Sequence, residues 1–510
     1  MGGNSQSQAS FRTARTVPWE LPFLLFLALA TALLCLGVAT NTVQLGIPGQ
    51  WTWNYLPSPL PIRPWPFLLP ACGLLAIGLA ARGIAGRGRA AHALTLGGIV
   101  VLGFLAAAQA KGVARGGTTY LMAVVASPRS TSYFIEAEQH DDLLHLLRAY
   151  PRLMPDMLKH ARTHPPGAVL FYRANISLLR RSPSLAAWLR GIVVAISGAD
   201  FETLRYSLGR IMNRPPPPSA DVVAMWVSAL LLAVLSAAVA IPVYLMLRSE
   251  AGPLAGLCGA LAWSVVPSAL NFTPQVDQLL CFIAAWSIAL FYLGIESRNE
   301  RWFAASGACL SLGISISLGL AALALLLATW GVLCRPGGWR KTIMAAAAFA
   351  IGLLLPLMGT ALLLGVDWIE IARVALHLHR VEILEAFPRQ YRPWLVWNVL
   401  DLLLFAGIPM TGWWAIHLLR RMRAGLSSWT TLDRLAIAWI VTLLAVDLSG
   451  ASRGETARIW LFLLPPIILA AGKELGQASA RGSTALAVSL ALCLVQVVVF
   501  EIFLGFFFIF

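Results

Sequence analysis

Residues 221–247 read DVVAMWVSALLLAVLSAAVAIPVYLML and contain one charged side chain, Asp221. A helix needs about 20 mostly apolar residues to cross the hydrocarbon core of a bilayer, so this stretch predicts a transmembrane helix. Comparable runs recur from Leu21 to Phe510. They predict an all-α, polytopic membrane protein with about 11 to 13 spans. The expected spans are 20–40, 65–82, 92–110, 221–247, 252–270, 276–295, 302–316, 319–334, 343–365, 395–416, 433–449, 457–472 and 483–508.

The composition also indicates a lipid environment. Of the 510 residues, 58% are hydrophobic and 12% are charged, whereas soluble domains carry about 25% charged residues. No stretch is long enough for a large separate soluble domain, so residues 1–510 are expected to form one transmembrane domain. The net charge of +15 comes from short Arg and Lys clusters between apolar runs, which is typical of topology signals and anionic-lipid contacts, not of nucleic-acid binding. The seven cysteines include no CxxC pair, so no metal site is predicted.

The basic clusters predict an orientation, because cytoplasmic loops are enriched in Lys and Arg. With a cytoplasmic N-terminus every cluster falls on the cytoplasmic side, and the C-terminus lies outside. The first apolar run, Leu21–Ala39, is longer than that of a typical signal peptide, which favours a retained span. The clusters are Arg12 and Arg15; Arg82, Arg87 and Arg89; Arg298 and Arg301; Arg335, Arg340 and Lys341; Arg420, Arg421 and Arg423; and Lys473 and Arg481.

The segment 111–220 interrupts the succession of spans and is too long for an ordinary connection. In this topology it is a large external loop. Leucines and methionines recur at helical spacing between charged residues over 143–158, which predicts an amphipathic helix on the membrane surface. The apolar stretch Leu185–Ser197 is short for a span and contains Arg190, so it is expected to be interfacial or re-entrant.

The acidic residues gather on the external side. Insertion of an acidic residue at the centre of a transmembrane helix costs about 2.5–3.5 kcal/mol, so acids in such segments usually have a function. Their common side predicts an external polar cavity ringed by helix ends. They are Glu136, Glu138, Asp141, Asp142 and Asp156 in the loop, and Asp277, Asp367, Asp401, Asp447 and Glu455 near span ends.

Three motifs stand out within this external set. Residues 136–142 read EAEQHDD, an acidic cluster, and residues 160–167 read HARTHPPG, where two prolines fix the angle of the preceding histidine. Residues 452–465 read SRGETARIWLFLLP. Taken singly, the acidic cluster also fits a solvated loop, and the His-Pro-Pro segment fits a simple turn. The Arg-Gly-Glu segment fits a positioning loop with internal ion pairs.

The order of these motifs resembles that of the GT-C membrane glycosyltransferases. An acidic motif in the first large external loop, followed by His-Pro-Pro, is similar to protein O-mannosyltransferases and the lipid A aminoarabinose transferase. Bacterial membrane proteins of the same superfamily carry similar segments to Ala161–Gly167 and Ser452–Pro465. Two features depart from the family pattern: two spans precede the span that leads into the loop, and Asp141-Asp142 replaces the usual Asp-Glu.

The resemblance implies a sugar donor linked to polyprenyl phosphate and a site at the non-cytoplasmic face, here of the bacterial inner membrane. Transfer with inversion needs a base for the acceptor and cations for the leaving phosphate. Asp142 is the expected base, with Asp141 second, and Asp142→Asn is expected to abolish transfer. Arg453 and Arg458 are expected to bind phosphate, because guanidinium groups match its oxygens. The remaining expected substrate-binding residues are Glu455, which would orient the arginines, His160, His164 and Asp277.

Several alternatives stay open. No cofactor is implied, a divalent metal is neither required nor excluded, and the acceptor is a lipid, a polysaccharide or a protein. A transporter or flippase for a lipid-linked or anionic solute would use the same residues as a binding site. The long external loop and the lack of inverted repeats count against a transporter. A structural or assembly role is the third interpretation.

Overall fold

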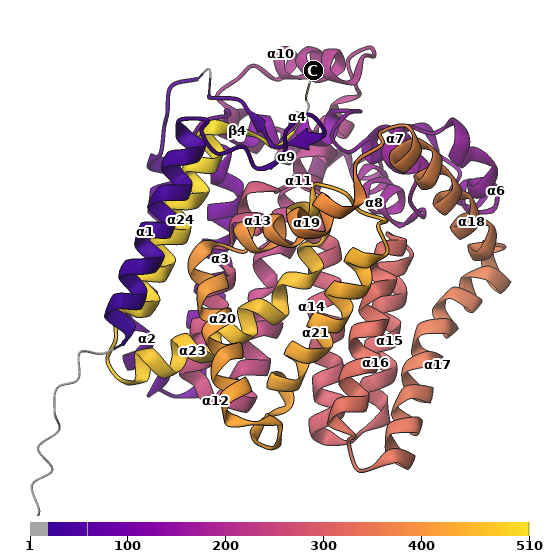
Figure 1. Cartoon of the computed structure of the whole chain (residues 1–510). Coiled ribbons are helices and arrows are strands. Elements are labelled where there is room, and N and C mark those ends of the chain that lie inside the picture. The colour runs from indigo at the N-terminus through magenta and orange to yellow at the C-terminus, as the bar shows by residue number, and fades with distance from the viewer. Residues whose placement is uncertain (1–18, 59, 508, 510) are drawn as a thin grey trace, which may run out of the picture.

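The computed structural model of the chain describes residues 19–58, 60–507 and 509. It is almost wholly helical, which confirms the all-α prediction (Figure 1). Most of the long helices run side by side as a bundle. They are α1 (Glu20–Ala39), α2 (Trp65–Ala85), α3 (Arg89–Ala110), α11 (Ser219–Ala238), α12 (Ala240–Trp263), α14 (Asp277–Ser297), α15 (Glu300–Ile314), α16 (Ala322–Cys334), α17 (Trp339–Leu364), α20 (Ile408–Ala424), α21 (Thr431–Leu448), α23 (Leu464–Ala480) and α24 (Ala485–Phe503).

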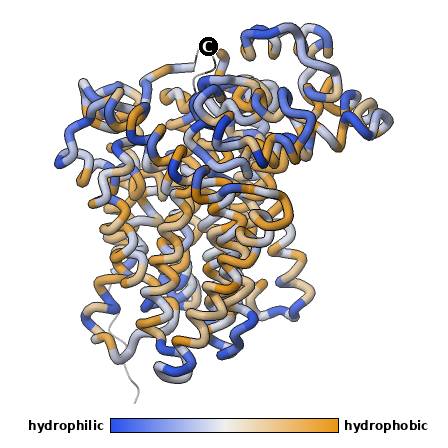
Figure 2. The backbone as a smooth tube through the Cα atoms, turned by 90° about the vertical axis from the view of Figure 1, so that its right-hand side faces the viewer, coloured by the Kyte–Doolittle hydropathy of each residue, from blue (hydrophilic) through white to orange (hydrophobic). Residues whose placement is uncertain are grey.

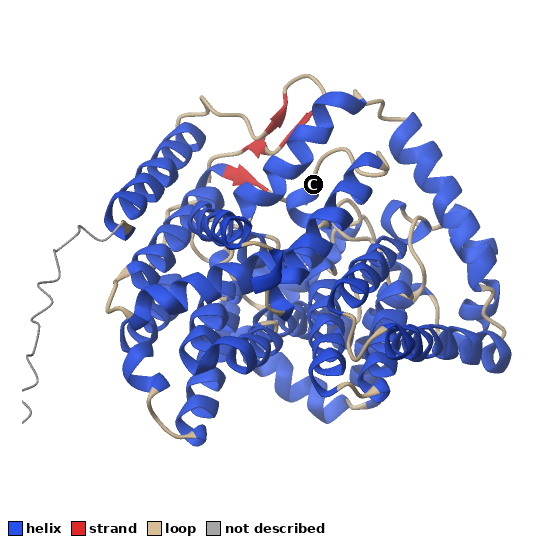
Figure 3. Cartoon of the chain, turned by 60° about the horizontal axis from the view of Figure 1, so that its bottom comes forward, coloured by secondary structure: helices blue, strands red, loops and turns tan. Residues whose placement is uncertain are grey.

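The other elements gather at one end of this bundle, drawn at the top of Figure 1, and are called the cap here. Two small antiparallel sheets, β1–β2 and β3–β4, hold the segment after α1 in the cap (Figure 3). The cap contains α4 (Thr118–Ala126), α5 (Tyr133–Gln139), α6 (Leu143–Leu153), α7 (Lys159–Arg162), α8 (Gly167–Arg181), α9 (Pro183–Ser197), α10 (Phe201–Met212), α13 (Pro267–Asn271), α18 (Trp368–His379), α19 (Tyr391–Phe405), α22 (Thr456–Ile459), β1 (Gly46–Ile47), β2 (Trp51–Thr52), β3 (Asn54–Tyr55) and β4 (Leu504–Gly505).

The residues of the bundle are mostly hydrophobic over its middle and more often hydrophilic toward its two ends (Figure 2). Leu69 on α2 is 78% exposed, and Leu362 and Leu363 on α17 are each 81% exposed. Soluble proteins rarely expose large contiguous apolar patches. In the described part of the chain, seven helices are long and apolar enough to cross a membrane, or up to nine if each of two bent pairs is one span. These features are consistent with an integral membrane protein.

The number of crossings depends on how breaks within helices are counted. The helical run Ser219–Trp263 contains a break at Gly252, where φ is 89°. A Cβ on Gly256 would lie 2.9 Å from the ring of Tyr244, and only a reversal of the chain brings these residues together. The predicted division after residue 247 is therefore confirmed as a reversal of the chain, but the second segment ends at Trp263 and not at 270, because α13 (Pro267–Asn271) is separate. Helices α15 and α16 are likewise separate, as predicted for 302–316 and 319–334.

Two further predicted spans also differ from the structure. The stretch 395–416 is not one straight helix, because α19 and α20 are bent by 108° after Phe405. Gly407 provides the turn with a φ of 97°, and Pro409 starts the next helix. Helix α23 begins at Leu464 instead of 457, because Thr456–Ile459 forms the short separate helix α22. In the external loop, Pro183–Ser197 and Phe201–Met212 form a second bent pair with an angle of 88°.

The basic clusters lie at the end of the bundle opposite the cap. Arg481 pairs with Glu20 at 2.5 Å, and Lys473 pairs with Glu250 at 2.8 Å. Thr431 donates a hydrogen bond to Glu296 at 2.8 Å. Arg12 and Arg15 lie outside the described residues. The assignment of this end to the cytoplasm, and of the cap to the other compartment, stays a prediction.

Helix α17 docks on the bundle through two glycines. A Cβ on Gly352 would overlap the carbonyl oxygen of Ala304 on α15, and one on Gly307 would overlap the carbonyl oxygen of Phe349. Small residues allow such close approach of helix backbones, which is how apolar helices associate in lipid.

This crossing gives a stability prediction. We expect Gly352→Val to lower the free energy of unfolding by about 2–3 kcal/mol, because the side chain forces the two helices apart. Gly359→Val on the same helix is the matched control, since a Cβ there meets no atom within 4 Å. Unfolding in mixed detergent micelles measures both variants. Equal effects of the two would contradict the docking role of Gly352.

Candidate functional site

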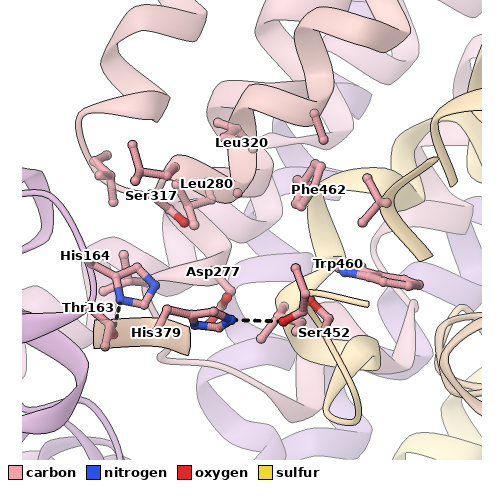
Figure 4. A pocket seen from close by; sticks show the side chains of 18 of the residues that line it. Thr163, His164, Asp277, Leu280, Ser317, Leu320, His379, Ser452, Trp460 and Phe462 are labelled. Atoms are coloured by element: carbon pink, nitrogen blue, oxygen red, sulfur yellow. Dashed lines mark hydrogen bonds between the residues drawn. The ribbon is translucent and has the colours of Figure 1, made fainter. Parts of the chain in front are cut away.

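A cavity of about 550 Å³ lies where the cap meets the bundle. Residues of α7, α14, α16, α18, α21 and α22 line it, so segments that are far apart in the sequence form its walls. Its lining divides into a polar part, with His164, His379 and Ser452, and an apolar part, with Leu280 and Phe462 (Figure 4). The cavity is therefore amphiphilic.

The apolar part reaches the outer surface of the bundle. Leu325 on α16 and Leu376 on α18 both line the cavity, and their exposed fractions are 41% and 61%. These two leucines therefore belong both to the cavity lining and to the exposed apolar surface of the protein.

Two histidines of the HARTHPPG motif line the polar part. The ring Nδ1 of His164 lies 2.9 Å from the carbonyl oxygen of His160 and 3.0 Å from the hydroxyl of Thr163. A carbonyl oxygen only accepts, so Nδ1 carries the proton and Nε2 is left as an acceptor. Burial lowers the pKa of His164 to about 4 and that of His160 to about 3. Both imidazoles are thus neutral at pH 7.

An acid and an arginine complete the polar part. Asp277, at the start of α14, lies 4.0 Å from the Nε of Arg458, and Arg458 Nη2 lies 2.7 Å from Glu455. The buried Nε of Arg458 has no hydrogen-bond partner among the residues described. The arginine is therefore held beside the cavity with donor capacity to spare, which suits a phosphate.

The structure brings together four of the eight predicted site residues in the lining, namely His160, His164, Asp277 and Arg458. Glu455 contacts Arg458 from behind the lining. Three further residues that the sequence did not single out also line the cavity: Tyr133, Ser452 and His379. His379 Nε2 lies 2.9 Å from the carbonyl oxygen of Ala451. Ser452 belongs to a quoted motif, but no motif marks His379.

Asp141 and Asp142 lie outside this lining. Asp142 is exposed and accepts hydrogen bonds from the backbone N–H groups of Leu144 and His145, so it caps α6. The hydrogen bond from the backbone of His145 is the main reason that its pKa lies below the usual value. Asp141 pairs with Arg173 at 2.7 Å and with Arg180 at 3.1 Å. Their role as base stays a prediction.

Arg453 is also outside the lining and turns toward Tyr391 instead, with its guanidinium 5.7 Å from the ring centre. In the described residues no group of three or more His, Cys, Asp or Glu is placed to hold a metal ion. The three cavity histidines and Asp277 form part of the polar lining of the cavity. The seven cysteines are unpaired.

The cavity histidines predict a pH dependence of stability. A pKa below the unfolded value of about 6.5 means that the unfolded chain binds the proton more readily, so this stability is full above pH 6.5 and is lost as pH falls toward 4. We expect the loss to reach up to about 2 kcal/mol per histidine at pH 5. Melting temperatures measured from pH 7 to pH 5 check this. The double variant His160→Gln/His164→Gln should show a flatter profile, and an unchanged slope would refute the burial of neutral imidazoles.

Comparison with protein-family models, curated proteins and solved structures gives no match to this chain.

Proposed function

We propose that the protein is a membrane glycosyltransferase of the GT-C type. It would take a sugar from a polyprenyl-phosphate donor and transfer it to an acceptor at the non-cytoplasmic face. The observation that carries this proposal is the amphiphilic cavity, with an arginine, an acid and neutral histidines at one end and an apolar opening at Leu325 and Leu376 at the other. A lipid phosphate bearing a sugar has the same division into a polar head and an apolar chain.

In this proposal the acceptor hydroxyl or amine gives its proton to a carboxylate and attacks the anomeric carbon. The bond from that carbon to the phosphate oxygen breaks, and its electron pair stays on the lipid phosphate, with inversion at carbon. Arg458 stabilises the charge that develops on the phosphate, because guanidinium donors aimed at developing charge are the strongest contribution available here. Glu455 keeps the guanidinium in place at 2.7 Å.

Asp277 is the carboxylate that we assign as base, because it lines the cavity beside Arg458. Asp142 and Asp141 remain the candidates that the family resemblance favours, although they lie outside the lining. His164 offers an unprotonated Nε2 to the cavity and would orient the acceptor by accepting a hydrogen bond.

A transfer assay tests the function. The purified protein in lipid nanodiscs is given undecaprenyl phosphate carrying radiolabelled mannose, glucose, galactose or aminoarabinose, together with envelope extract from cells that lack the protein. We expect one donor to be consumed, with release of undecaprenyl phosphate and label in the extract, and Arg458→Gln to lose this activity. Movement of intact donor across liposomes without a new covalent product would instead identify a flippase.

A further inference from the structure

A second polar cluster lies on the other face of the loop that forms part of the cavity wall. Ala451 and Ser452 of this loop line the cavity, whereas the next residue, Arg453, faces Tyr391. A Cβ on Gly454 would meet the guanidinium of Arg389 and lie 3.2 Å from the rings of Trp51 and Trp394. The loop thus separates the cavity from a group of arginines and aromatic rings, called the arginine–aromatic cluster here (Arg389, Arg453, Trp51, Trp394 and Tyr391).

The rings and guanidinium groups of this cluster lie within cation–π distance of one another. Arg389 lies 5.7 Å from the ring centres of both Trp51 and Trp394. Each arginine donates a hydrogen bond to the main-chain carbonyl of the other, Arg453 to Arg389 at 2.7 Å. These contacts fix both guanidinium groups in position without neutralising them.

No ion pair compensates the charge of the cluster, and Glu455 attracts Arg389 only from beyond ion-pair distance. No carboxylate of the described chain lies within 4.0 Å of Arg389 or Arg453, and the buried Nε of Arg453 has no hydrogen-bond partner there. Other half-buried arginines have acidic partners, such as Arg162 with Glu382 at 2.8 Å and Arg180 with Asp221 at 2.7 Å. Glu455, two residues beyond Arg453, is engaged by Arg458. Half-buried cations are normally paired, because leaving them unpaired costs free energy.

We propose that the arginine–aromatic cluster binds a sugar that carries a phosphate or a carboxylate. The two guanidinium groups supply fixed donors for the anion. Tyr391 is 38% exposed and Trp51 is half-buried, so both have ring surface on which a sugar can stack. The site is separate from the cavity and one residue away from it along the loop.

The position of the cluster suggests which substrate it holds. A donor in the cavity would lie against Ala451 and Ser452, and a ligand on Arg453 would lie on the opposite face of the same loop. We therefore assign the cluster to an anionic acceptor glycan. This assignment rests on the proposed function, whereas the binding itself does not.

The binding is tested with glucose 6-phosphate as the probe, titrated calorimetrically into the full-length protein in phosphatidylcholine nanodiscs, with glucose as the neutral comparison. We expect the phosphorylated sugar to bind and glucose to bind at least 10-fold more weakly. Arg389→Gln and Arg453→Gln should each weaken the binding by about 10-fold or more, since each removes a charge-assisted contact. Arg392→Gln, an exposed neighbour, and Arg458→Gln, in the cavity, should leave it unchanged.

Unchanged binding in the Arg389 and Arg453 variants, or loss of binding only in Arg458→Gln, overturns the proposal. If those variants fail to fold, the exposed Tyr391→Ala replaces them and should weaken binding at least 5-fold. Nanodiscs that contain phosphatidylglycerol distinguish a lipid headgroup from a glycan, because strong competition by this lipid in the wild-type protein would overturn the glycan assignment. If the protein binds the probe but transfers no sugar, the arginine–aromatic cluster is still an anion-binding site. Only its assignment to an acceptor glycan is then refuted.

Discussion

Replacement of Asp277 by asparagine is expected to lower the rate of sugar transfer by about 10²- to 10⁴-fold, the range typical of a lost general base. Asparagine keeps the shape of the side chain and cannot take a proton. Asp277 also lies 4.0 Å from Arg458, so part of the loss would reflect a changed position of that arginine. The transfer assay in nanodiscs measures the effect, and a melting curve confirms that the variant is folded.

Asp142→Asn is the matched control for this prediction, and it separates the two base assignments. Asparagine caps helices about as well as aspartate, so the end of α6 should be preserved. The family resemblance predicts that this variant loses transfer, whereas the position of Asp142 outside the cavity leads us to expect transfer within about 2-fold of the wild type. If Asp142→Asn loses transfer and Asp277→Asn retains it, the base is Asp142 in the external loop and not Asp277.

The second large effect concerns the ion pair between Lys111 and Glu501. Both side chains are 1% exposed, and Asn271 donates a hydrogen bond to Glu501 at 2.8 Å. This pair ties the end of α3 to the end of α24, close to the β3–β4 sheet in the cap. We expect Glu501→Ala to lower the free energy of unfolding by about 3–5 kcal/mol, because it leaves Lys111 as an unpaired buried charge.

Two further variants test the cause of that loss. The double variant Lys111→Met/Glu501→Leu removes both charges and should recover most of the lost stability, since buried pairs can often be replaced by apolar side chains. Glu370→Ala breaks the exposed pair with Arg373 and should have no measurable effect. Unfolding in mixed detergent micelles measures all of these variants. A double variant that is as unstable as Glu501→Ala would show that the charge imbalance is not the cause.

The apolar runs predicted most of the fold, because a helix in lipid must satisfy its backbone within one segment and therefore needs a long apolar stretch. The break between α15 and α16 was visible as a Ser/Gly-rich centre. The bend between α19 and α20 was missed, because the apolar residues continue on both sides of Gly407 and Pro409, where the chain turns. The short helix α22 was missed because it joins the charged motif SRGETARI to the apolar run that follows it.

The site was predictable in part. Two sequence features marked constrained positions: the prolines after His164 and the arginines of the SRGETARI segment. His164 and Arg458, one residue from each feature, both line the cavity. The sequence could not show which way each side chain turns. Arg453 and Arg458 belong to one motif, yet Arg453 faces the ring of Tyr391 and Arg458 pairs with Glu455. His379 comes to the cavity through the packing of α18, which no local pattern specifies.

The central claim is that the cavity holds a polyprenyl phosphate with its chain leaving at Leu325 and Leu376. Photo-crosslinking with a diazirine-bearing polyprenyl phosphate in nanodiscs, followed by mass spectrometry of the peptides, tests it most directly. We expect adducts that concentrate on residues 318–325 and around Leu376 and that disappear in the presence of unlabelled polyprenyl phosphate. Adducts spread evenly over lipid-exposed helices such as α1 and α17, without competition, would contradict it.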